Sequence, residues 1–302
     1  MTSTTPPLPT LQLIGGGKLG RTLSRLWHDK GYFSINQILT RNETTANEAQ
    51  DFIAGGHALW RWSELSAPPQ PCLWLIAVAD SQLAEAAHTL SQQQLVKPGD
   101  VVFHCSGATS STILKPLQDQ GAYTASIHPV HSFANPEKSL SSFAGSHCAY
   151  EGDRQALTQL LPAFEALGAE LFEVSAKHKS LYHAGSVMAC NYLVALLDAS
   201  FASFAAAGVE RERASQLLAP LVHQTADNVF NTSPQAALTG PISRGDHTTV
   251  EQQLQALEKL NPEIAKLYNQ LGQQTLHIAE QQQQATPEDL QRIQALLDDG
   301  KN

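Results

Sequence analysis

The chain has 302 residues, 42% of them hydrophobic, and its 19 basic and 28 acidic side chains give a formal net charge of -9. At about 150 residues per domain, this length predicts two domains. The acidic balance argues against a nucleic-acid binder, because nothing would attract a polyanion non-specifically. No run of about 18 apolar residues exists, so we expect no membrane-spanning helix. The first nine residues lack the basic and long apolar regions of a secretory signal and predict a floppy tail on a cytoplasmic protein.

Strand-like and helical patterns alternate in the first half of the chain. Apolar strand-like runs occupy residues 11–14, 34–40, 72–79, 101–105, 122–127, 146–150 and 171–174. Helical patterns separate several of these runs and cover residues 18–30, 43–55 and 154–167. The run at 72–79 is apolar throughout, as expected of a parallel strand that is covered on both faces. The alternation predicts an α/β fold with a doubly wound parallel sheet.

The second half of the chain has only helical patterns. Residues 177–207 predict one long apolar helix, and a second helical pattern covers residues 210–230. Further signals are a kink at Pro220, a capping box of Thr248 with Glu251, and helix starts at Asn261-Pro262 and Thr286-Pro287. We therefore expect a nucleotide-binding domain over residues 1–175 and a helical substrate and dimerisation domain over residues 176–302.

The four cysteines, Cys72, Cys105, Cys148 and Cys190, are scattered without a Cys-x-x-Cys pair. This spacing is poor for a zinc site or a redox dithiol, and it is sparse for a disulfide scaffold. We expect reduced thiols that pack as small apolar residues.

A glycine-rich turn joins the first strand-like run to the first helical pattern. The segment Gly15-Gly16-Gly17-Lys18-Leu19-Gly20 fits G-x-G-x-x-G in the required context of strand, turn and helix. The first glycine permits the tight turn, and the second lets a pyrophosphate approach the backbone at the helix N-terminus. The candidate cofactor contacts here are Gly15, Gly17, Lys18, Leu19 and Gly20. The alternative is a glycine turn with a purely structural role.

Arg41 lies where dinucleotide-binding proteins recognise the adenosine ribose. NAD enzymes usually place Asp or Glu about 20 residues beyond the last glycine. This chain has Thr40-Arg41-Asn42 there, and an arginine suits a 2′-phosphate instead. The sequence therefore favours NADP over NAD, unless Arg41 is only a solvated loop charge.

Together with further motifs, the glycine turn resembles that of a known family. The other stretches are His-Cys-Ser-Gly-Ala at 104–108, Ser-Ile-His-Pro-Val-His-Ser-Phe at 126–133, Lys-Ser-Leu-Tyr-His at 179–183 with Asn191, and Thr-Gly-Pro-Ile-Ser-Arg-Gly-Asp at 239–246. The chain resembles a family of Rossmann-like oxidoreductases whose helical C-terminal half is a domain of unknown function. That family is related to pyrroline-5-carboxylate reductase, deazaflavin-dependent NADP oxidoreductases and β-hydroxyacid dehydrogenases. The resemblance implies NADP(H), a small-molecule substrate and a homodimer formed through the helical half.

Three candidate site residues follow predicted strands, and ligands of such sheets lie beyond the carboxyl ends of the strands. By analogy with β-hydroxyacid dehydrogenases, Ser106 would contact substrate or nicotinamide. Asp80 could contact the cofactor or act as a helix N-cap before Ser81. His128 could donate or accept a proton, or be a hydrogen-bonded loop histidine. We discount a metal site at His128-x-x-His131, because no third ligand is marked.

The predicted long helix carries Lys179 and His183 on one face, since they are four residues apart. β-Hydroxyacid dehydrogenases have a catalytic lysine here with an asparagine four residues later. In this chain the asparagine is displaced to Asn191, which on a straight helix would point about 80° away from His183. Lys179, Tyr182 and His183 are the candidate proton donors, and the alternative is an ordinary amphipathic helix packed on the sheet.

Arg244 lies in a Gly/Pro loop between two predicted helices. It could hold a substrate carboxylate through two parallel hydrogen bonds, pair with Asp246, or cap a helix. The leading hypothesis is an NADP-dependent reductase of a small carbonyl or imine, in which His128, His183 or Lys179 supplies the proton and Arg244 orients an acid group. The alternatives are a Rossmann protein that senses NADP without turnover and a dehydrogenase that works in the oxidative direction.

Overall fold

The structure is a computed structural model that describes residues 8–66, 68–69 and 72–299. Most of the predicted N-terminal tail falls on residues 1–7, outside the described residues. The chain forms two compact units, residues 1–187 and residues 188–302. The first compact unit continues into the long helix and ends at residue 187. The domain boundary expected at residue 175 stays a prediction.

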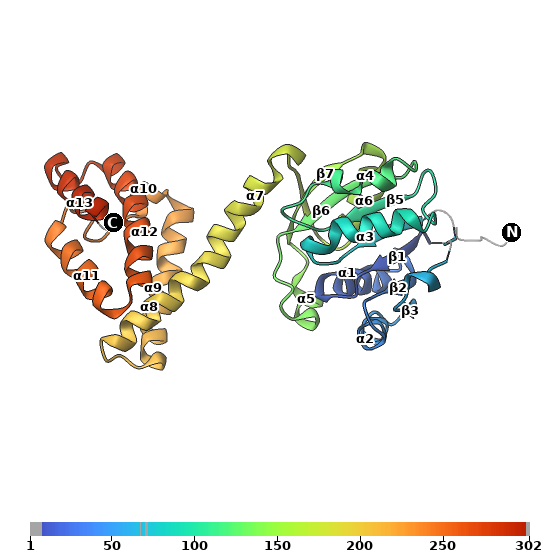
Figure 1. Cartoon of the computed structure of the whole chain (residues 1–302), viewed down its shortest axis with the longest axis horizontal. Coiled ribbons are helices and arrows are strands. Elements are labelled where there is room, and N and C mark those ends of the chain that lie inside the picture. Colours follow the sequence, from blue (N-terminus) through green and yellow to red (C-terminus); the bar gives the residue numbers. More distant parts are fainter. Residues whose placement is uncertain (1–7, 67, 70–71, 300–302) are drawn as a thin grey trace. The chain divides into compact units, whose positions relative to one another are not determined.

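The first unit contains an eight-stranded sheet with the order β3-β2-β1-β4-β5-β6-β7-β8 (Figure 1). The strands are β1 (Thr10–Ile14), β2 (Ser34–Leu39), β3 (His57–Leu59), β4 (Cys72–Ile76), β5 (Val101–His104), β6 (Tyr123–Pro129), β7 (His147–Gly152) and β8 (Glu170–Glu173). All neighbours are parallel except β6 and β7, which are antiparallel. The predicted doubly wound α/β sheet is thus confirmed, with one reversed pairing. The short edge strand β3 was not predicted, because three residues show no periodicity.

Each face of the sheet packs on its own hydrophobic cluster. In β4, Leu73 and Leu75 join one cluster, whereas Trp74 and Ile76 join the other. Successive side chains of a strand point to opposite faces, so a strand covered on both sides is apolar throughout. Trp27 is buried in the first cluster, and its indole N–H donates to the Ala163 carbonyl at 2.8 Å.

Helices cover both faces of this sheet (Figure 1). The helices of this unit are α1 (Lys18–Asp29), α2 (Glu43–Ile53), α3 (Asp80–Gln92), α4 (Lys115–Gln118), α5 (Pro136–Ser142), α6 (Arg154–Glu165) and α7 (Lys179–Ser186), of which α7 begins the long helix after the last strand. Short 3-10 turns cover Trp62–Glu64, Ser111–Leu114 and Ala176–His178. Residues of α1, α2 and α6 contribute to the first cluster, and residues of α3 and α4 contribute to the second.

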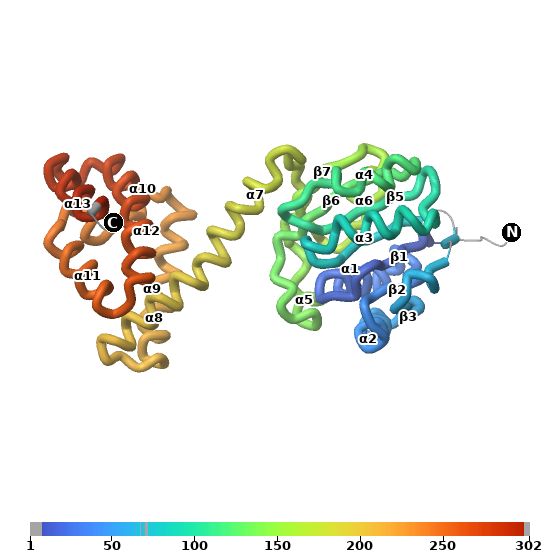
Figure 2. The backbone as a smooth tube through the Cα atoms, in the orientation of Figure 1, coloured from blue at the N-terminus to red at the C-terminus, as the bar shows by residue number. Residues whose placement is uncertain are grey.

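The described part of the second unit is entirely helical apart from its connections (Figure 2). Its helices are α8 (Tyr192–Ala206), α9 (Arg211–Asn231), α10 (Pro234–Ala237), α11 (His247–Leu260), α12 (Pro262–Gln282) and α13 (Pro287–Asp299). Helices α11, α12 and α13 pack together around Val250, Leu276 and Ile293. The predicted all-helical C-terminal half is confirmed.

Two of the three predicted helix starts of this unit are confirmed. Asn261 caps α12 by accepting from the Glu263 N–H at 2.9 Å, and Thr286 accepts from the Asp289 N–H before α13. The capping box predicted at Thr248 and Glu251 is wrong. Asp246 is the N-cap of α11 instead, because its carboxylate accepts both the N–H and the hydroxyl of Thr249.

The predicted long helix is interrupted by a π-helical turn over Val187–Asn191, between α7 and α8. The straight-helix estimate for Asn191 therefore does not apply, because a π turn rotates the following residues. Among the described residues, one helical stretch, Ala176–Ala206, is long and apolar enough to cross a membrane by length and composition. Polar residues interrupt this stretch, so it contains no uninterrupted apolar run of about 18 residues. One such helix is weak evidence of a membrane span, and the expected absence of a membrane partner stays a prediction.

Candidate active site

The glycine-rich turn between β1 and α1 forms a cradle that side chains would fill. Gly15 has a φ of +101°, and a Cβ on it would lie 2.4 Å from the Ala77 carbonyl oxygen. A Cβ on Gly20 would lie 2.5 Å from the Gly15 carbonyl oxygen, whereas one on Gly17 would meet nothing within 4 Å. Gly17 is also the N-cap of α1 and supplies no side-chain cap. The first N–H groups of α1 therefore face an open space that suits an anion.

Three predicted cofactor contacts lie around this turn in different surroundings. Leu19 is half-buried against the core, and Lys18 is exposed with its ammonium donating to the Ala134 carbonyl at 2.8 Å. Asp80 is exposed and is the first residue of α3, whose N-cap is Ala79. The N-cap alternative for Asp80 is therefore wrong, and Asp80 stays a candidate cofactor contact.

A cavity of about 550 Å³ extends from the glycine turn to the ends of β2 and β3. Its polar and aromatic walls include Thr40, Arg41, Thr45, Trp60 and Trp62. Arg41 is exposed, and its guanidinium forms no ion pair or hydrogen bond with the described residues. The structure thus leaves a cation available beside the predicted pyrophosphate cradle.

A second, smaller cavity of about 120 Å³ lies where β4 and β5 end. It is lined by Asp80, His104 and Ser106 and shares Ala77 and Val78 with the larger cavity. The Ser106 side chain is nearly buried, and its hydroxyl accepts from the Thr109 N–H at 3.0 Å. Ser106 and Asp80 are thus brought together, next to the glycine turn.

His128, Tyr182 and His183 form a cluster between the end of β6 and α7. The hydroxyl of Tyr182 lies 2.9 Å from Nδ1 of His128, and the His128 and His183 rings are 5.8 Å apart. A Cβ on Gly107 would lie 2.6 Å from Nδ1 of His183 and 2.8 Å from the His128 ring. A glycine is therefore required between the two histidines. Nδ1 of His183 is buried and has no hydrogen-bond partner among the described residues.

Burial sets the protonation of this cluster. Desolvation, together with the charges of His183 and Lys179, lowers the pKa of His128 to about 4. Desolvation raises the pKa of the Tyr182 phenol above its ordinary value. Near neutral pH the imidazole is therefore uncharged and the phenol is protonated, so the pair holds a proton that can be shared between oxygen and nitrogen.

Lys179, at the start of α7, is buried in an ion pair that the sequence analysis did not foresee. Its ammonium lies 3.3 Å from Glu151 and donates to the hydroxyl of Ser126. Glu151 also accepts the N–H and the hydroxyl of Ser111, both at 2.7 Å. The antiparallel pairing of β7 with β6 places Glu151 opposite Ser126. The predicted strand-like run ends at residue 150, so Glu151, directly after it, carried no sequence signal for this role.

His104 is a further buried polar residue beside Ser106. Its Nδ1 accepts from the Ser106 N–H at 3.1 Å, so its Nε2 carries the proton and donates to the Ser110 carbonyl at 3.3 Å. Burial and the neighbouring Lys179 charge lower the pKa of His104 to about 3. This neutral imidazole fixes the turn that presents Ser106.

His131 does not join His128. Its two ring nitrogens hydrogen-bond the hydroxyls of Ser146 and Ser139. Among the described residues, no group of three His, Cys, Asp or Glu side chains could hold a metal ion.

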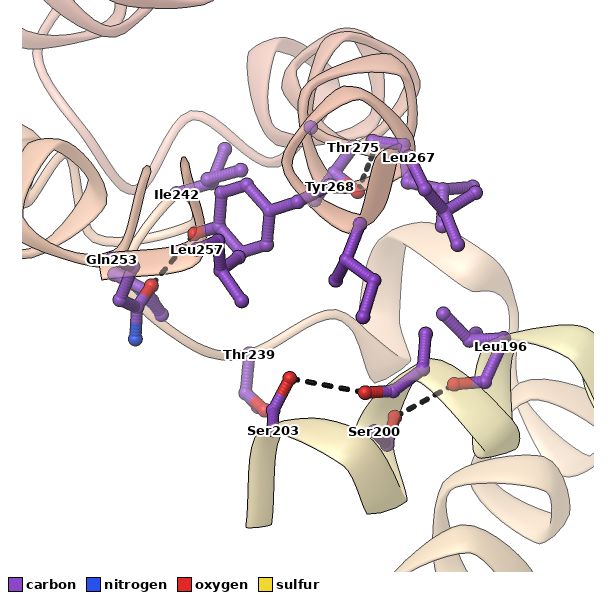
Figure 3. A pocket seen from close by; sticks show the side chains of 15 residues that line it. Leu196, Ser200, Ser203, Thr239, Ile242, Gln253, Leu257, Leu267, Tyr268 and Thr275 are labelled. Carbon is purple, nitrogen blue, oxygen red and sulfur yellow. Dashed lines mark hydrogen bonds between the residues drawn. The ribbon is translucent and has the colours of Figure 1, made fainter. Parts of the chain in front are cut away.

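Arg244 belongs to the other compact unit, where it is exposed in the turn before α11. Asp246 caps α11 and forms no ion pair with Arg244 within 4 Å. The same unit has an apolar cavity of about 320 Å³ between α8, α11 and α12. Figure 3 shows its few polar side chains, and the Tyr268 hydroxyl there donates to Gln253 at 2.6 Å. Among the residues that the structure describes, no charged side chain lines this cavity.

Comparison with known proteins is consistent with this organisation. A family model described as a Rossmann-like domain matches residues 8–129, and one described as a domain of unknown function (DUF2520) matches residues 146–275. No curated protein matches the sequence. The crystal structure of protein TM1727 from Thermotoga maritima is 28% identical, with a TM-score of 0.67 over 90% of this chain and 98% of that chain.

Two further solved structures share the fold. BF3122 from Bacteroides fragilis, provisionally described as an NADP oxidoreductase, is 19% identical with a TM-score of 0.71, over 90% of this chain and 99% of that chain. The imine reductase from Myxococcus stipitatus in complex with NADP+ is 16% identical with a TM-score of 0.63, over 85% of this chain and 90% of that chain. The family models thus match a Rossmann-like domain in the first half of the chain and DUF2520 after it.

Proposed function

We propose that the protein is an NADP(H)-dependent oxidoreductase that reduces a small carbonyl or imine compound. The observation that carries this proposal is that two features lie at the carboxyl ends of parallel strands of one sheet, β1 and β6, with β4 and β5 between them. One is the glycine cradle with its open α1 N-terminus, and the other is the His128–Tyr182 pair. Ligands of doubly wound sheets bind at this edge. The fold shared with the NADP+-bound imine reductase supports the same reading.

The residues of the larger cavity fit a dinucleotide phosphate. The uncapped N–H groups of α1 would hold the pyrophosphate, and the free guanidinium of Arg41 would hold a 2′-phosphate. Ala77 and Val78 line both cavities, so a bound dinucleotide would extend past them toward Asp80 and Ser106. NADPH bound in this way would supply the hydride for the reduction.

Tyr182 is the proton donor in this proposal. Its phenol is protonated near neutral pH, and Nδ1 of His128 lies within hydrogen-bond distance of the hydroxyl. His128 can orient that hydroxyl and exchange its proton, as general acid catalysis requires. His183 lies beside His128 and would contact the substrate on the side of Gly107.

Lys179 has a different role in this proposal from the one expected by analogy. Its side chain is 1% exposed, and its ammonium is bound by Glu151 and Ser126. A buried ammonium held by two partners is poorly placed to deliver a proton to substrate. We infer that Lys179 is a positioning residue that attaches the first turn of α7 to the sheet. Arg244 stays the proposed contact for a substrate carboxylate.

We also propose a homodimer formed through the helical unit. Large apolar side chains are exposed on α8 and α9, among them Tyr192, Val194, Leu221 and Phe230. Exposed apolar patches on helices commonly mark protein interfaces. Size-exclusion chromatography with light scattering should give the mass of two chains, and the mass of one chain would refute this proposal.

The test of the enzymatic proposal is turnover with NADPH. Purified protein is mixed with NADPH and a panel of small ketones, aldehydes and cyclic imines, and loss of NADPH absorbance is followed. We expect Tyr182→Phe to lower kcat by about 100-fold or more at unchanged NADPH affinity. Tyr123→Phe is the matched control, since its hydroxyl forms no hydrogen bond with the described residues. Equal turnover by wild type and Tyr182→Phe would refute the assigned proton donor.

A further inference from the structure

The carboxyl ends of β2 and β3 leave the sheet side by side. The Thr40 N–H donates to the Leu59 carbonyl at 2.9 Å, so the next residues along each strand, Arg41 and Trp60, emerge as neighbours. On the other side, the Gly15 N–H donates to the Leu39 carbonyl at 2.8 Å. The glycine turn, Arg41 and Trp60 therefore follow one another across the sheet edge, and all three line the larger cavity.

Trp60 and Trp62 both line this cavity but differ in their packing. Trp62 packs against the second hydrophobic cluster, together with Leu59 and Val78. The Trp60 side chain is half-buried and packs in none of the hydrophobic clusters formed by the described residues. Its backbone N–H is turned toward the Glu64 carboxylate at 3.5 Å. The indole face of Trp60 is therefore available to a ligand, although the core does not require an aromatic ring there.

We propose that Trp60 is a specificity-determining residue that stacks on the adenine ring of the dinucleotide, beside the 2′-phosphate contact of Arg41. This inference rests on the proposed function and adds the residue that recognises the base. Stacking on an indole recognises a flat heteroaromatic ring through its face, and the free guanidinium of Arg41 recognises the adjacent phosphate. Arg61, the next arginine along the chain, shares its guanidinium with Glu64 at 3.7 Å, whereas the guanidinium of Arg41 has no such partner among the described residues.

The competing role for Trp60 is structural cover. β3 is the edge strand of the sheet, and a bulky side chain after it could shield that edge from solvent. Structural cover would make Trp60 matter for stability and leave nucleotide affinity unchanged. The two roles therefore differ in what a truncation changes.

The test uses binding of cofactor fragments to the full-length protein, measured by titration calorimetry. The probes are adenosine 2′,5′-bisphosphate, 5′-AMP and nicotinamide mononucleotide. We expect Trp60→Ala to weaken both adenosine probes about tenfold and to leave the mononucleotide unchanged. Trp60→Phe should keep most of the affinity, because it keeps an aromatic face. Arg41→Gln should weaken the bisphosphate about tenfold or more but not 5′-AMP.

Unchanged affinity of Trp60→Ala for both adenosine probes, with a lowered Tm, would overturn the inference and assign Trp60 to structural cover. In that case NADPH would still bind the wild type, and the proposed function would stand. Absence of NADPH binding to the wild type would overturn the proposed function. If adenosine 2′,5′-bisphosphate still bound in a Trp60-dependent way, the base site would stand without the reductase.

Discussion

The ammonium of Lys179 lies 3.3 Å from the carboxylate of Glu151, and both side chains are shielded from solvent. Two hydrogen bonds from Ser111 and one contact with Ser126 complete the surroundings of this pair. One charge alone in this place would be costly, because its solvation would be lost without compensation. The pair links the start of α7, which carries Tyr182 and His183, to the middle of β6 and the carboxyl end of β7.

Removal of both members of this pair should destabilise the protein by less than the sum of the two single removals. We expect Glu151→Gln or Lys179→Met alone to lower the free energy of unfolding by about 3–5 kcal/mol. The double variant should lose clearly less than the sum, because no unpaired buried charge remains. Urea denaturation measures these values. Lys266→Ala, at the exposed Lys266–Glu263 pair, is the control and should change stability by about 0.5 kcal/mol or less. Additive losses in the double variant would contradict the coupling.

The buried histidines predict a loss of stability in mild acid. The pKa values of His128 and His104 are lowered to about 4 and about 3 in the folded protein, below their ordinary value of 6.5. The folded state then binds fewer protons than the unfolded state, so its stability is highest above about pH 6.5 and falls as the pH drops toward 4. Denaturation curves collected across this pH window measure the effect.

His128→Asn should flatten part of this pH dependence, because it removes one of the two groups that must stay uncharged. A stability that stays constant from neutral pH down to pH 4 would show that neither histidine has the lowered pKa.

Gly107 should tolerate no side chain. A methyl group there would lie 2.6 Å from the His183 ring and 2.8 Å from the His128 ring. Since aromatic rings do not bend, both imidazoles would have to shift to make room. We expect Gly107→Ala to cost about 1–3 kcal/mol and to shift the imidazole NMR signals of both histidines. Gly185→Ala in α7 is the matched control. A methyl group there meets nothing within 4 Å, so this change should be neutral or stabilising. Unchanged histidine signals in Gly107→Ala would refute the close packing.

Substitutions at two positions of the glycine turn should affect folding and cofactor binding differently. Gly15→Ala should destabilise the protein, because its positive φ and the 2.4 Å approach to the Ala77 carbonyl both exclude a Cβ. Gly17→Ala should lower Tm only slightly, since the space around it is open and only the helix N-cap is affected, yet weaken NADPH binding by obstructing the α1 N-terminus. Thermal melts with and without NADPH distinguish the two variants. A Gly17→Ala protein with wild-type NADPH affinity would place the pyrophosphate elsewhere.

Local patterns predicted the sheet and the glycine turn because both depend on residues that are close together in the sequence. The apolar run at 72–79 and the glycines at 15–20 need only their neighbours to be interpreted. The role of Glu151 was not predicted, because it depends on the antiparallel pairing of β7 with β6, and no local sequence pattern indicates that pairing. The roles of Asp246 and Asp80 at helix starts depended on where α11 and α3 begin, within a residue or two.

The π turn at Val187–Asn191 could not be predicted from the sequence either. Its residues, Val-Met-Ala-Cys-Asn, follow an ordinary helical pattern, and packing determines whether the helix widens into a π turn there. The stacking face of Trp60 depends on β3, whose three residues carry no periodicity. Both features depend on contacts between segments that lie apart in the sequence.

The most direct test of the whole account is a thermal-shift titration of the full chain with NADPH, NADP, NADH and NAD. Binding stabilises the folded state by RT ln(1 + [L]/Kd), so a ligand at about 100 times its Kd adds about 2.7 kcal/mol. We predict a clear rise in Tm with the two phosphorylated dinucleotides, and a loss of their advantage in Arg41→Gln. No rise in Tm with any of the four dinucleotides would contradict the account.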